Sequence, residues 1–339
     1  MCREKIVYER DLAPYLSKYP DRSLSSRIRA LCDQQTRIWP QFRLGHNAMK
    51  RAQTRCIELG ASWVLCQYTP HRITSVSARV DPVSVRKRPC FLCPQNLYPE
   101  EKGLAYTEDY LILCNVSPIF DLHLVITHCQ HVPQSIQPHF DMALRVAQDL
   151  SPDFVLIYNG PRCGASAPDH LHLQAFPAQN LPLPAQLWVD DLSGADGIVM
   201  NCETIRIAAP TGFSRNFLTF ESRDPSILSH WFRQTLQILA QIEPVSSEPM
   251  INLVMAHGGK GWKMILFPRG KHRPDCYHRE GDNQLLISPG AIDMAGVFVI
   301  PRQRDFHRVD ATILRDIYKE VSLDENRFSR VIAELIRRK

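Results

Sequence analysis

The chain has 339 residues, of which 44% are hydrophobic and 22% charged, and 25 prolines are spread along its length. This composition is typical of a globular protein with two domains or one large one, and it excludes a disordered, collagen-like or coiled-coil chain. The 40 basic and 35 acidic side chains leave a net charge of +5. That charge is too small to indicate a nucleic-acid-binding protein, but it suits an anionic small substrate.

We expect a cytoplasmic protein with no membrane contact. The apolar runs are shorter than the roughly 18 residues of a membrane-spanning helix, and the charged start of the sequence is unlike a secretion signal. The 11 cysteines are an odd number. They are expected to be reduced thiols, some of them metal ligands, rather than a disulfide framework.

The predicted elements of the first half begin with helices. Residues 22–58 are predicted to be helical, because apolar side chains recur at spacings of three and four on both sides of Pro40. Short β-branched and aromatic runs then predict strands at 62–68, 110–115 and 122–127. A helix at 133–150, a strand at 154–158, a Gly/Pro/Ser loop at 159–169 and an alternating strand at 170–176 follow. The Pro- and Ala-rich segment 177–197 is the expected domain boundary.

The second half repeats this order. Strands are predicted at 198–207, 216–221, 251–256, 262–267 and 295–300, and helices at 225–243, 311–321 and 324–338. If Pro177 and Pro268 end equivalent strands of a degenerate repeat, Lys263 lies opposite His172. The predicted fold is therefore α+β, with two halves that each form an antiparallel sheet with helices packed on it. The two sheets are expected to face each other, and the expected limits are 1–60 for an N-terminal helical segment, 61–180 and 181–339.

The strongest chemical signal is the alternation of polar and apolar residues at 170–174. Residues two apart on a strand share a face, so His170, His172 and Gln174 lie on one side, with Leu171 and Leu173 buried on the other. Three polar groups on one face of an apolar strand are costly unless they line a cleft or bind a ligand. This pattern favours a functional site over two histidines on a half-exposed strand.

The loop before this strand suits a phosphate group. Gly164, Ala165 and Ser166 offer backbone N–H groups and a hydroxyl, which together can cradle phosphate oxygens. A neutral imidazole beside a bound phosphate can attack phosphorus and form a covalent intermediate. The loop and the histidine strand together predict phosphoryl or nucleotidyl chemistry.

A second signal is the pair Cys90 and Cys93, whose spacing lets both thiolates reach one tetrahedral ion. One such pair is half a site, and it is also compatible with a redox pair or with two buried thiols. The missing ligands are expected from His131 and His170, and His128 competes with His131. A metal ion on His170 would fix the orientation of its ring and leave His172 without a metal ligand role.

The motif His-Leu-His-Leu-Gln behind a Gly-x-Ser loop resembles the histidine-triad superfamily. It is most similar to the branch with galactose-1-phosphate uridylyltransferase, diadenosine tetraphosphate phosphorylase and the GDP-hexose phosphorylases, whose motif is His-x-His-x-Gln. Further similar segments are Trp63–Leu65 with Pro70–Arg72, and Asn115–Pro118 with His123–Ile126 and His131. The resemblance covers 62–177, and the second half matches in outline. The stretch 67–93 also resembles a bacterial subfamily whose substrate does not follow from membership.

The resemblance implies an α+β fold of two HIT-like halves, with the motif in 61–180 and a degenerate second half. It implies that His172 is the nucleophile that becomes nucleotidylated, and that Gln174 binds the transferred phosphoryl group. It implies a structural zinc that uses His170 as a ligand, so that His170 supports catalysis. The implied substrate-binding residues are Arg72, Asn159, Gly164, Ala165 and Ser166. Apart from the resemblance, Lys263 is expected to point into the same cleft if the repeat is real; it belongs to a basic cluster at 263–273.

The predicted function is a nucleotidyltransferase or phosphorylase. A nucleotidyl-His172 intermediate would form from a dinucleoside polyphosphate or a nucleoside-diphosphate sugar, and phosphate or a sugar phosphate would accept the nucleotidyl group. A hydrolase of the same superfamily and a nucleotide-binding protein without catalysis are the alternatives. A zinc-dependent RNA-binding module is disfavoured, because the sequence has no second Cys-x-x-Cys pair. Uridylyltransferases are often dimers, so a homodimer is compatible with the resemblance.

Overall fold

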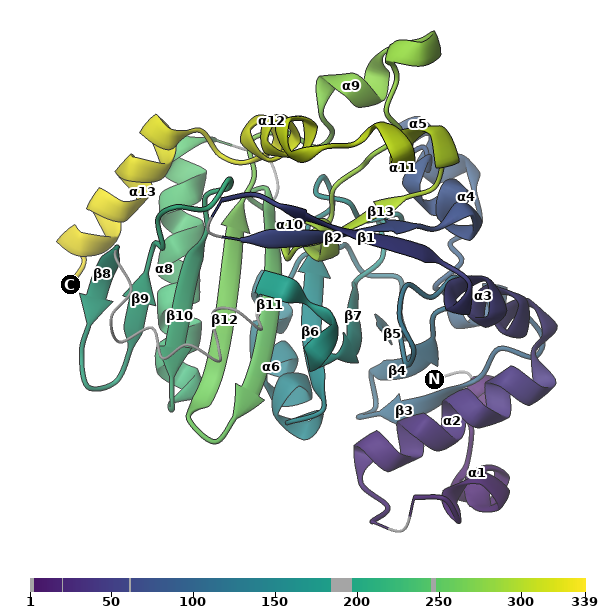
Figure 1. The fold of residues 1–339 in the computed structure, drawn as a ribbon. Helices are drawn as coiled ribbons and strands as arrows, with labels where there is room; N and C mark the ends of the chain where they lie inside the picture. Colours follow the sequence, from purple (N-terminus) through teal and green to yellow (C-terminus); the bar gives the residue numbers. More distant parts are fainter. Residues whose placement is uncertain (1–2, 20, 61, 184–196, 245–247) are drawn as a thin grey trace.

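A computed structural model describes residues 3–19, 21–60, 62–183, 197–244 and 248–339. Its main feature is an antiparallel sheet with the strand order β3-β4-β5-β7-β6-β11-β12-β10-β9-β8 (Figure 1). The first half supplies β3 (Gly103–Tyr106), β4 (Tyr110–Cys114), β5 (Leu124–His128), β6 (Phe154–Asn159) and β7 (His172–Pro177). The second half supplies β8 (Ile198–Asn201), β9 (Arg206–Ala208), β10 (Leu218–Ser222), β11 (Ile251–Gly258) and β12 (Gly261–Pro268). The two halves join where β6 pairs with β11.

One face of this sheet is covered by helices. These are α1 (Glu9–Leu16), α2 (Leu24–Ile38), α6 (Phe140–Asp149), α8 (Pro225–Ile242) and α13 (Glu325–Arg337). Phe154, Leu156 and Tyr158 of β6 point toward this layer, as the alternation of a strand requires. Several of the helices begin at a side-chain cap: Asp224 accepts a hydrogen bond from the first turn of α8, and Asp324 does so for α13.

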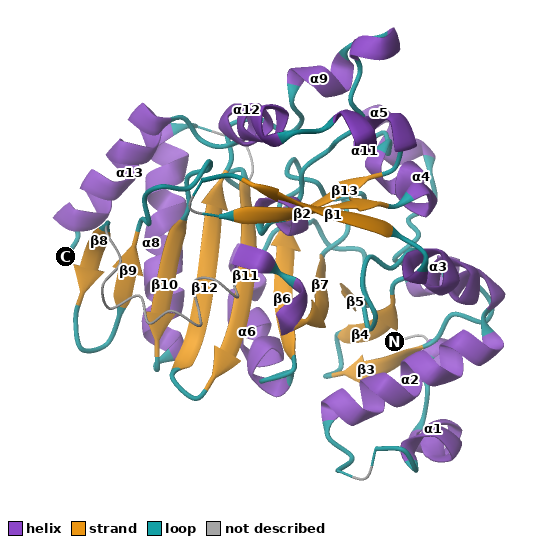
Figure 2. Cartoon of the chain, in the orientation of Figure 1, coloured by secondary structure: helices purple, strands orange, loops and turns teal. Residues whose placement is uncertain are grey.

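The other face is covered by a smaller sheet and by C-terminal segments (Figure 2). The smaller sheet consists of β1 (Gln53–Glu58), β2 (Trp63–Tyr68) and β13 (Val297–Ile300), and β13 runs parallel to β2. Val155 and Ile157 of β6 point into this second core. The remaining helices are α3 (Pro40–Lys50), α4 (Ile73–Val76), α5 (Pro82–Lys87), α9 (Asp275–His278), α10 (Ala291–Met294), α11 (Gln303–Arg308) and α12 (Ala311–Val321).

The structure confirms the α+β fold and the antiparallel strands of each half. It differs from two other expectations, and a third lies mostly outside the described residues. The helix predicted over 22–58 is wrong at 53–58, because these residues pair with β2 as β1 and their burial alternates. The two sheets do not face each other, since the pairing of β6 with β11 makes them one sheet. Most of the expected boundary, 177–197, lies outside the described residues.

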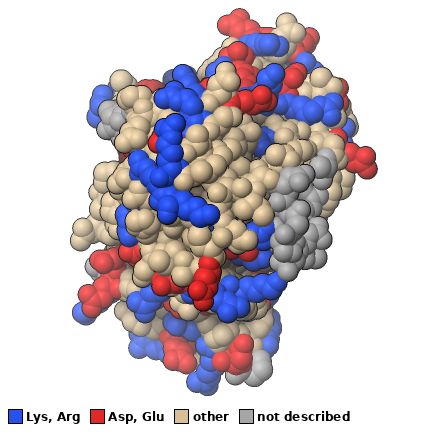
Figure 3. Space-filling model, turned by 90° about the vertical axis from the view of Figure 1, so that its left-hand side faces the viewer, with Lys and Arg blue, Asp and Glu red and all other residues tan. Residues whose placement is uncertain are grey.

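None of the described helices combines the length and the hydropathy that a membrane span requires. At the end of the molecule where β8 and α13 lie, a stripe of basic side chains runs beside uncharged surface, with acidic groups above and below it (Figure 3). The modest net charge is therefore not gathered into a uniformly basic surface on this end.

Phe140 of α6 and Phe232 of α8 pack against each other and connect the helices of the two halves. Their rings are stacked, with centroids 3.8 Å apart and planes 15° from parallel, and both side chains are buried. Replacing Phe232 with Ala removes most of this contact and leaves a cavity. We expect Phe232→Ala to lower the free energy of unfolding, measured in urea, by about 3–5 kcal/mol.

Leu44→Ala on α3 is the matched control for this measurement. The Leu44 side chain is 70% exposed, so its truncation is expected to change the free energy of unfolding by less than about 0.5 kcal/mol. An equal loss of unfolding free energy in the two variants would contradict the conclusion that the stacked rings stabilise the contact between the two halves.

Candidate active site

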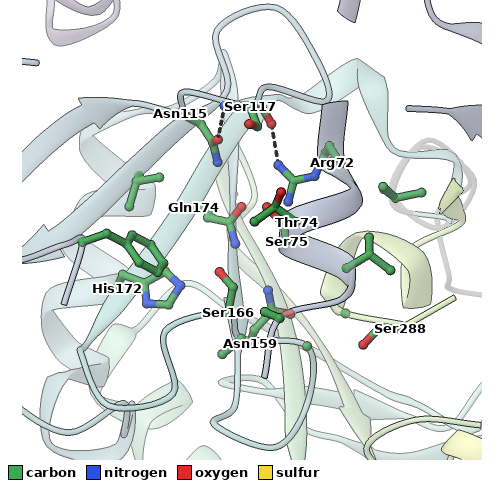
Figure 4. Close-up of a pocket in the computed structure, with 18 of the residues that line it drawn as sticks. Arg72, Thr74, Ser75, Asn115, Ser117, Asn159, Ser166, His172, Gln174 and Ser288 are labelled. Atoms are coloured by element: carbon green, nitrogen blue, oxygen red, sulfur yellow. Dashed lines mark hydrogen bonds between the residues drawn. The ribbon is translucent and has the colours of Figure 1, made fainter. Parts of the chain in front are cut away.

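A cavity of about 700 Å³ lies at the ends of the first-half strands. Its walls come from β4, β6 and β7, from the loop 164–166, from residues around α4 and from the segment that leads into α10. His172, Gln174, Ser166 and Asn159 converge on one space, and Arg72 approaches it from the opposite wall (Figure 4). The cavity therefore gathers His172 and Gln174 of the sequence motif together with Ser166 and Asn159.

His172 presents one free ring nitrogen to this cavity. Its backbone N–H donates to Gln134 Oε1 over 2.8 Å, and its Nδ1 lies 2.9 Å from the carbonyl oxygen of His170. A carbonyl oxygen can only accept, so Nδ1 carries the proton and Nε2 keeps its lone pair. Burial lowers the pKa of His172, which favours the neutral ring. The side chain is thus held as a neutral imidazole with an available nucleophilic nitrogen.

Gln174 is oriented by a buried histidine, His123. The backbone N–H of Ile119 donates to His123 Nδ1 over 3.1 Å, so the neutral ring carries its proton on Nε2. That nitrogen lies 2.8 Å from Gln174 Oε1 and donates to it. Burial, together with the nearby Arg72, lowers the pKa of His123 to about 3, which keeps the ring neutral. The amide nitrogen of Gln174 is left as a hydrogen-bond donor in the cavity.

Asn159, at the end of β6, is fixed by the second half of the chain. Its Oδ1 accepts from Asn252 Nδ2 over 2.9 Å and from the backbone N–H of Ala291 over 2.7 Å. Asn252 in turn is held by Arg269, whose Nη1 donates to Asn252 Oδ1. Since its oxygen is committed, Asn159 can offer only its amide N–H groups to a molecule in the cavity.

The loop 164–166 has the features of an anion cradle. Gly164 has φ +93°, and a Cβ at this position would lie 2.6 Å from the Cα of Gly290. Arg88 donates to the Ser166 carbonyl and to Asp169, which ties the loop to the segment that follows α5. Within the described parts of the chain, the backbone N–H groups of 164–166 donate to no other group. They remain available for phosphate oxygens.

Arg72 lines the cavity, and Lys263 does not. Arg72 donates to the carbonyl oxygen of Ser117, and burial lowers its pKa to about 10, so it keeps its charge at neutral pH. Lys263 lies on β12, three strands away from β7, and its Nζ is 3.8 Å from Glu221 Oε1. The repeat that placed Lys263 opposite the motif therefore does not describe this arrangement.

Cys90, Cys93, His131 and His170 form one cluster beside the cavity, with ligand atoms that all lie within 4.8 Å of one another. His170 Nε2 lies 2.7 Å from the carbonyl oxygen of His128 and donates to it, so Nδ1 is free and faces Cys90 Sγ at 3.3 Å. Cys93 Sγ lies 3.3 Å from His131 Nδ1. Two thiolates and two imidazoles at these positions suit one tetrahedral metal ion.

Of the two histidines that the sequence left open, the structure brings His131 to this cluster. His128 Nδ1 accepts from the backbone N–H of Gln130, and its ring packs edge-on against Tyr110. His170 belongs to both parts of the site, since its side chain is in the cluster and its carbonyl oxygen orients His172.

Comparison with known proteins supports this reading of the fold. Residues 31–177 match a family model described as a domain of unknown function, DUF4922, and residues 192–338 match the C-terminal domain of GDPGP1-like proteins. Yeast Ap4A phosphorylase Apa2 in complex with AMP has a similar structure, with a TM-score of 0.57 at 14% identity over 86% of this chain and 96% of that chain. The chain shares the fold of this phosphorylase. Comparison with curated proteins finds no match.

Two further solved structures are similar to this chain. Apa2 in complex with Ap4A has a TM-score of 0.57 at 13% identity, covering 84% of this chain and 97% of that chain. An ADP-glucose phosphorylase from Arabidopsis thaliana with bound ADP-glucose has a TM-score of 0.37 at 13% identity, covering 78% of this chain and 98% of that chain.

Sequence reasoning missed three residues that hold the site in place. His123 was noted only as part of a similar segment, Asn252 was not noticed within its apolar strand, and Arg269 was one of a basic cluster. All three are buried, with at most 1% of their surface exposed. A polar residue inside an apolar strand, as at Asn252, is the one available signal, because its burial needs a partner.

Gly164 allows a test of the loop geometry. An L side chain is strained at φ +93°, and its Cβ would clash with the backbone of Gly290. We expect Gly164→Ala to destabilise the protein by more than about 1 kcal/mol in urea unfolding. Gly258→Ala, where a Cβ would meet nothing within 4 Å, is the control and is expected to change stability by less than about 0.5 kcal/mol. A stability of Gly164→Ala equal to that of the control would exclude this account of the loop.

Proposed function

We propose that this protein is a nucleotidyltransferase of the phosphorylase type that acts through a covalent nucleotidyl-His172 intermediate. The observation that carries the proposal is the free Nε2 of His172 in a cavity that also holds the amide of Gln174 and the unpaired N–H groups of 164–166. The likeness in fold to yeast Ap4A phosphorylase, solved with AMP and with Ap4A, supports a nucleotide substrate.

The first step joins His172 to the α-phosphorus of a dinucleoside polyphosphate or a nucleoside-diphosphate sugar. The N–P bond forms as the bond from phosphorus to the bridging oxygen breaks, and the leaving group departs as a nucleotide or a sugar phosphate. The imidazole gains positive charge, which the contact of its Nδ1–H with the His170 carbonyl oxygen stabilises. Gln174, Arg72 and the loop N–H groups face the negative charge that develops on the phosphoryl oxygens.

In the second step an oxygen of an acceptor phosphate attacks the same phosphorus and releases His172. Two in-line displacements give net retention of configuration at phosphorus and ping-pong kinetics. A hydrolase, with water as the acceptor, is the alternative within the same chemistry. Turnover that depends on added phosphate distinguishes the phosphorylase, and tight binding without turnover or adduct identifies a binding protein.

The covalent step is tested by intact-protein mass after incubation with nucleotides and nucleotide sugars at neutral pH without an acceptor. Wild-type protein is expected to gain one nucleoside monophosphate, whose mass identifies the base, and His172→Ala is expected to gain none. His230→Ala, which removes an exposed histidine of α8, is the control and is expected to behave like wild type. Near-wild-type turnover by His172→Ala would refute the intermediate.

We also propose that Cys90, Cys93, His131 and His170 hold a structural zinc ion. The donor set, two cysteines and two histidines with free Nδ1 atoms on His131 and His170 toward the sulfur atoms, supports this assignment. The ion would fix the His170 ring at the start of β7, and with it the backbone carbonyl that orients His172.

Metal content tests the zinc proposal. We expect about one zinc per chain by mass spectrometry of the purified protein, and well under half of that in Cys93→Ser, which removes one of four ligands. The melting temperature of Cys93→Ser should fall as well. Cys202→Ser, at an exposed cysteine outside the cluster, should keep both values. Equal zinc contents in the two variants would place the metal elsewhere.

A further inference from the structure

The two strands that carry His172 and Asn159 separate where they reach the cavity. β6 and β7 pair in a regular antiparallel register, which ends at the pair of Ile157 with Gln174. Continued by two residues, this register would place Asn159 opposite His172. That pair does not form, although β6 extends to Asn159 and β7 begins at His172. The backbone groups of both residues therefore need another partner.

The side chain of Gln134 supplies this partner. Its Oε1 accepts the backbone N–H of His172 over 2.8 Å. Its Nε2 donates to the carbonyl oxygen of Asn159 over 2.8 Å and to the carbonyl oxygen of His172 over 3.1 Å. The two N–H groups of one amide are enough for both carbonyl oxygens. The buried carboxamide thus stands in for the missing backbone hydrogen bonds between the two strands.

This insertion sets the spacing of two residues that line the cavity. Strands that pair directly lie about 4.8 Å apart in the hydrogen-bonding direction. A carboxamide between two strands makes two hydrogen bonds in series, which requires a wider gap. His172 and Asn159 extend their side chains into the cavity from the two sides of this gap (Figure 4). Gln134 itself is not among the residues that line the cavity.

The segment that carries Gln134 is fixed by the second half of the chain. Glu248 Oε2 accepts the backbone N–H of Ile136 over 2.7 Å and the hydroxyl of Ser135 over 3.2 Å. The other oxygen, Oε1, lies 2.5 Å from the hydroxyl of Tyr158, which is the residue of β6 next to Asn159. The backbone that leads away from Gln134 is therefore attached to the same strand that its side chain contacts.

We propose that Gln134 is a positioning residue for nucleotidyl transfer, which holds the backbone of His172 so that its Nε2 is aimed at the α-phosphorus. The inference rests on the proposed function and adds the group that aims the nucleophile. A misplacement of about 1 Å can lower the rate of such a step by about 100-fold. Because Gln134 does not line the cavity, its loss should affect the transfer step rather than the binding of the donor.

The first test follows adduct formation on His172 by intact-protein mass at several concentrations of Ap4A, ADP-glucose, GDP-glucose or UDP-glucose, without an acceptor. Gln134→Met keeps an unbranched side chain of similar length but removes the carboxamide. Its maximum rate of adduct formation is expected to fall at least tenfold. The half-saturating donor concentration is expected to change by less than threefold. A maximum rate equal to that of wild type, or a loss confined to the half-saturating concentration, would overturn the proposal.

Two further variants accompany this measurement. Gln137→Met changes an exposed glutamine of the same segment and is expected to keep both values. Gln134→Asn keeps the carboxamide but withdraws it by one methylene, so it cannot reach all three backbone groups, and the space left suits a water molecule. It is expected to slow adduct formation as well. Melting temperatures identify the variants that fold, and a wild-type rate in folded Gln134→Asn would also overturn the proposal.

A second test measures backbone hydrogen exchange by mass spectrometry and needs no turnover. Peptides that contain 170–174 are expected to exchange faster in Gln134→Met than in wild type or Gln137→Met, because the His172 N–H loses its acceptor. Peptides from α8 are expected to keep their rates. Equally faster exchange throughout the chain would indicate a general loss of stability and would overturn the local role of Gln134.

The adduct on the wild-type protein separates this inference from the proposed function. An adduct that forms on wild type, and equally fast on Gln134→Met, would refute the role of Gln134 alone. No adduct on wild type from any of the four donors would refute the proposed function, and the role of Gln134 in transfer with it, whatever the exchange rates are.

Discussion

The pairing of β6 with β11 is the interaction on which the rest of the structure depends. It places Asn159 opposite Asn252 and joins the strands of two halves into one sheet. Arg269, buried in the second half, fixes Asn252, and Asn252 fixes the cavity-lining Asn159. A half that carries no histidine motif therefore contributes to the site through a buried hydrogen-bond chain. Loss of one partner would leave polar groups unpaired in the core. The pairing of β6 with β11 therefore affects both the geometry of the site and the stability of the fold.

Backbone groups decide the state of the two histidines that matter most. The His170 carbonyl oxygen assigns the proton of His172 to Nδ1, and the Ile119 N–H assigns the proton of His123 to Nε2. One assignment leaves a nucleophilic nitrogen facing the cavity, and the other turns the Gln174 amide nitrogen into a donor. Burial lowers the pKa of both rings, and the charge of Arg72 lowers that of His123 further, so both imidazoles are held neutral.

The sequence predicted those parts of the site that depend on local spacing. The face shared by His172 and Gln174 follows from the period of a strand, and the cluster of two cysteines and two histidines follows from residue types with few alternatives. The prediction failed where long-range pairing decides. Residues 53–58 have an acceptable helical pattern, yet they form β1 because β2 provides a partner. The partners of His123 and Arg269 lie on segments that only the folded sheet brings together, so neither role was visible in the sequence.

Electrostatics explains how a chain with a net charge of only +5 can suit an anionic substrate. The relevant charges lie within the cavity rather than over the surface. Arg72 Nε and Arg88 Nη1 are buried without a hydrogen-bond partner in the described structure, and each unsatisfied donor costs about 1–3 kcal/mol. In the folded protein these guanidinium groups are already desolvated and held by carbonyl oxygens. A phosphate group near Gln174 would meet at least one of them, so part of the free-energy cost of organising the site is met by folding.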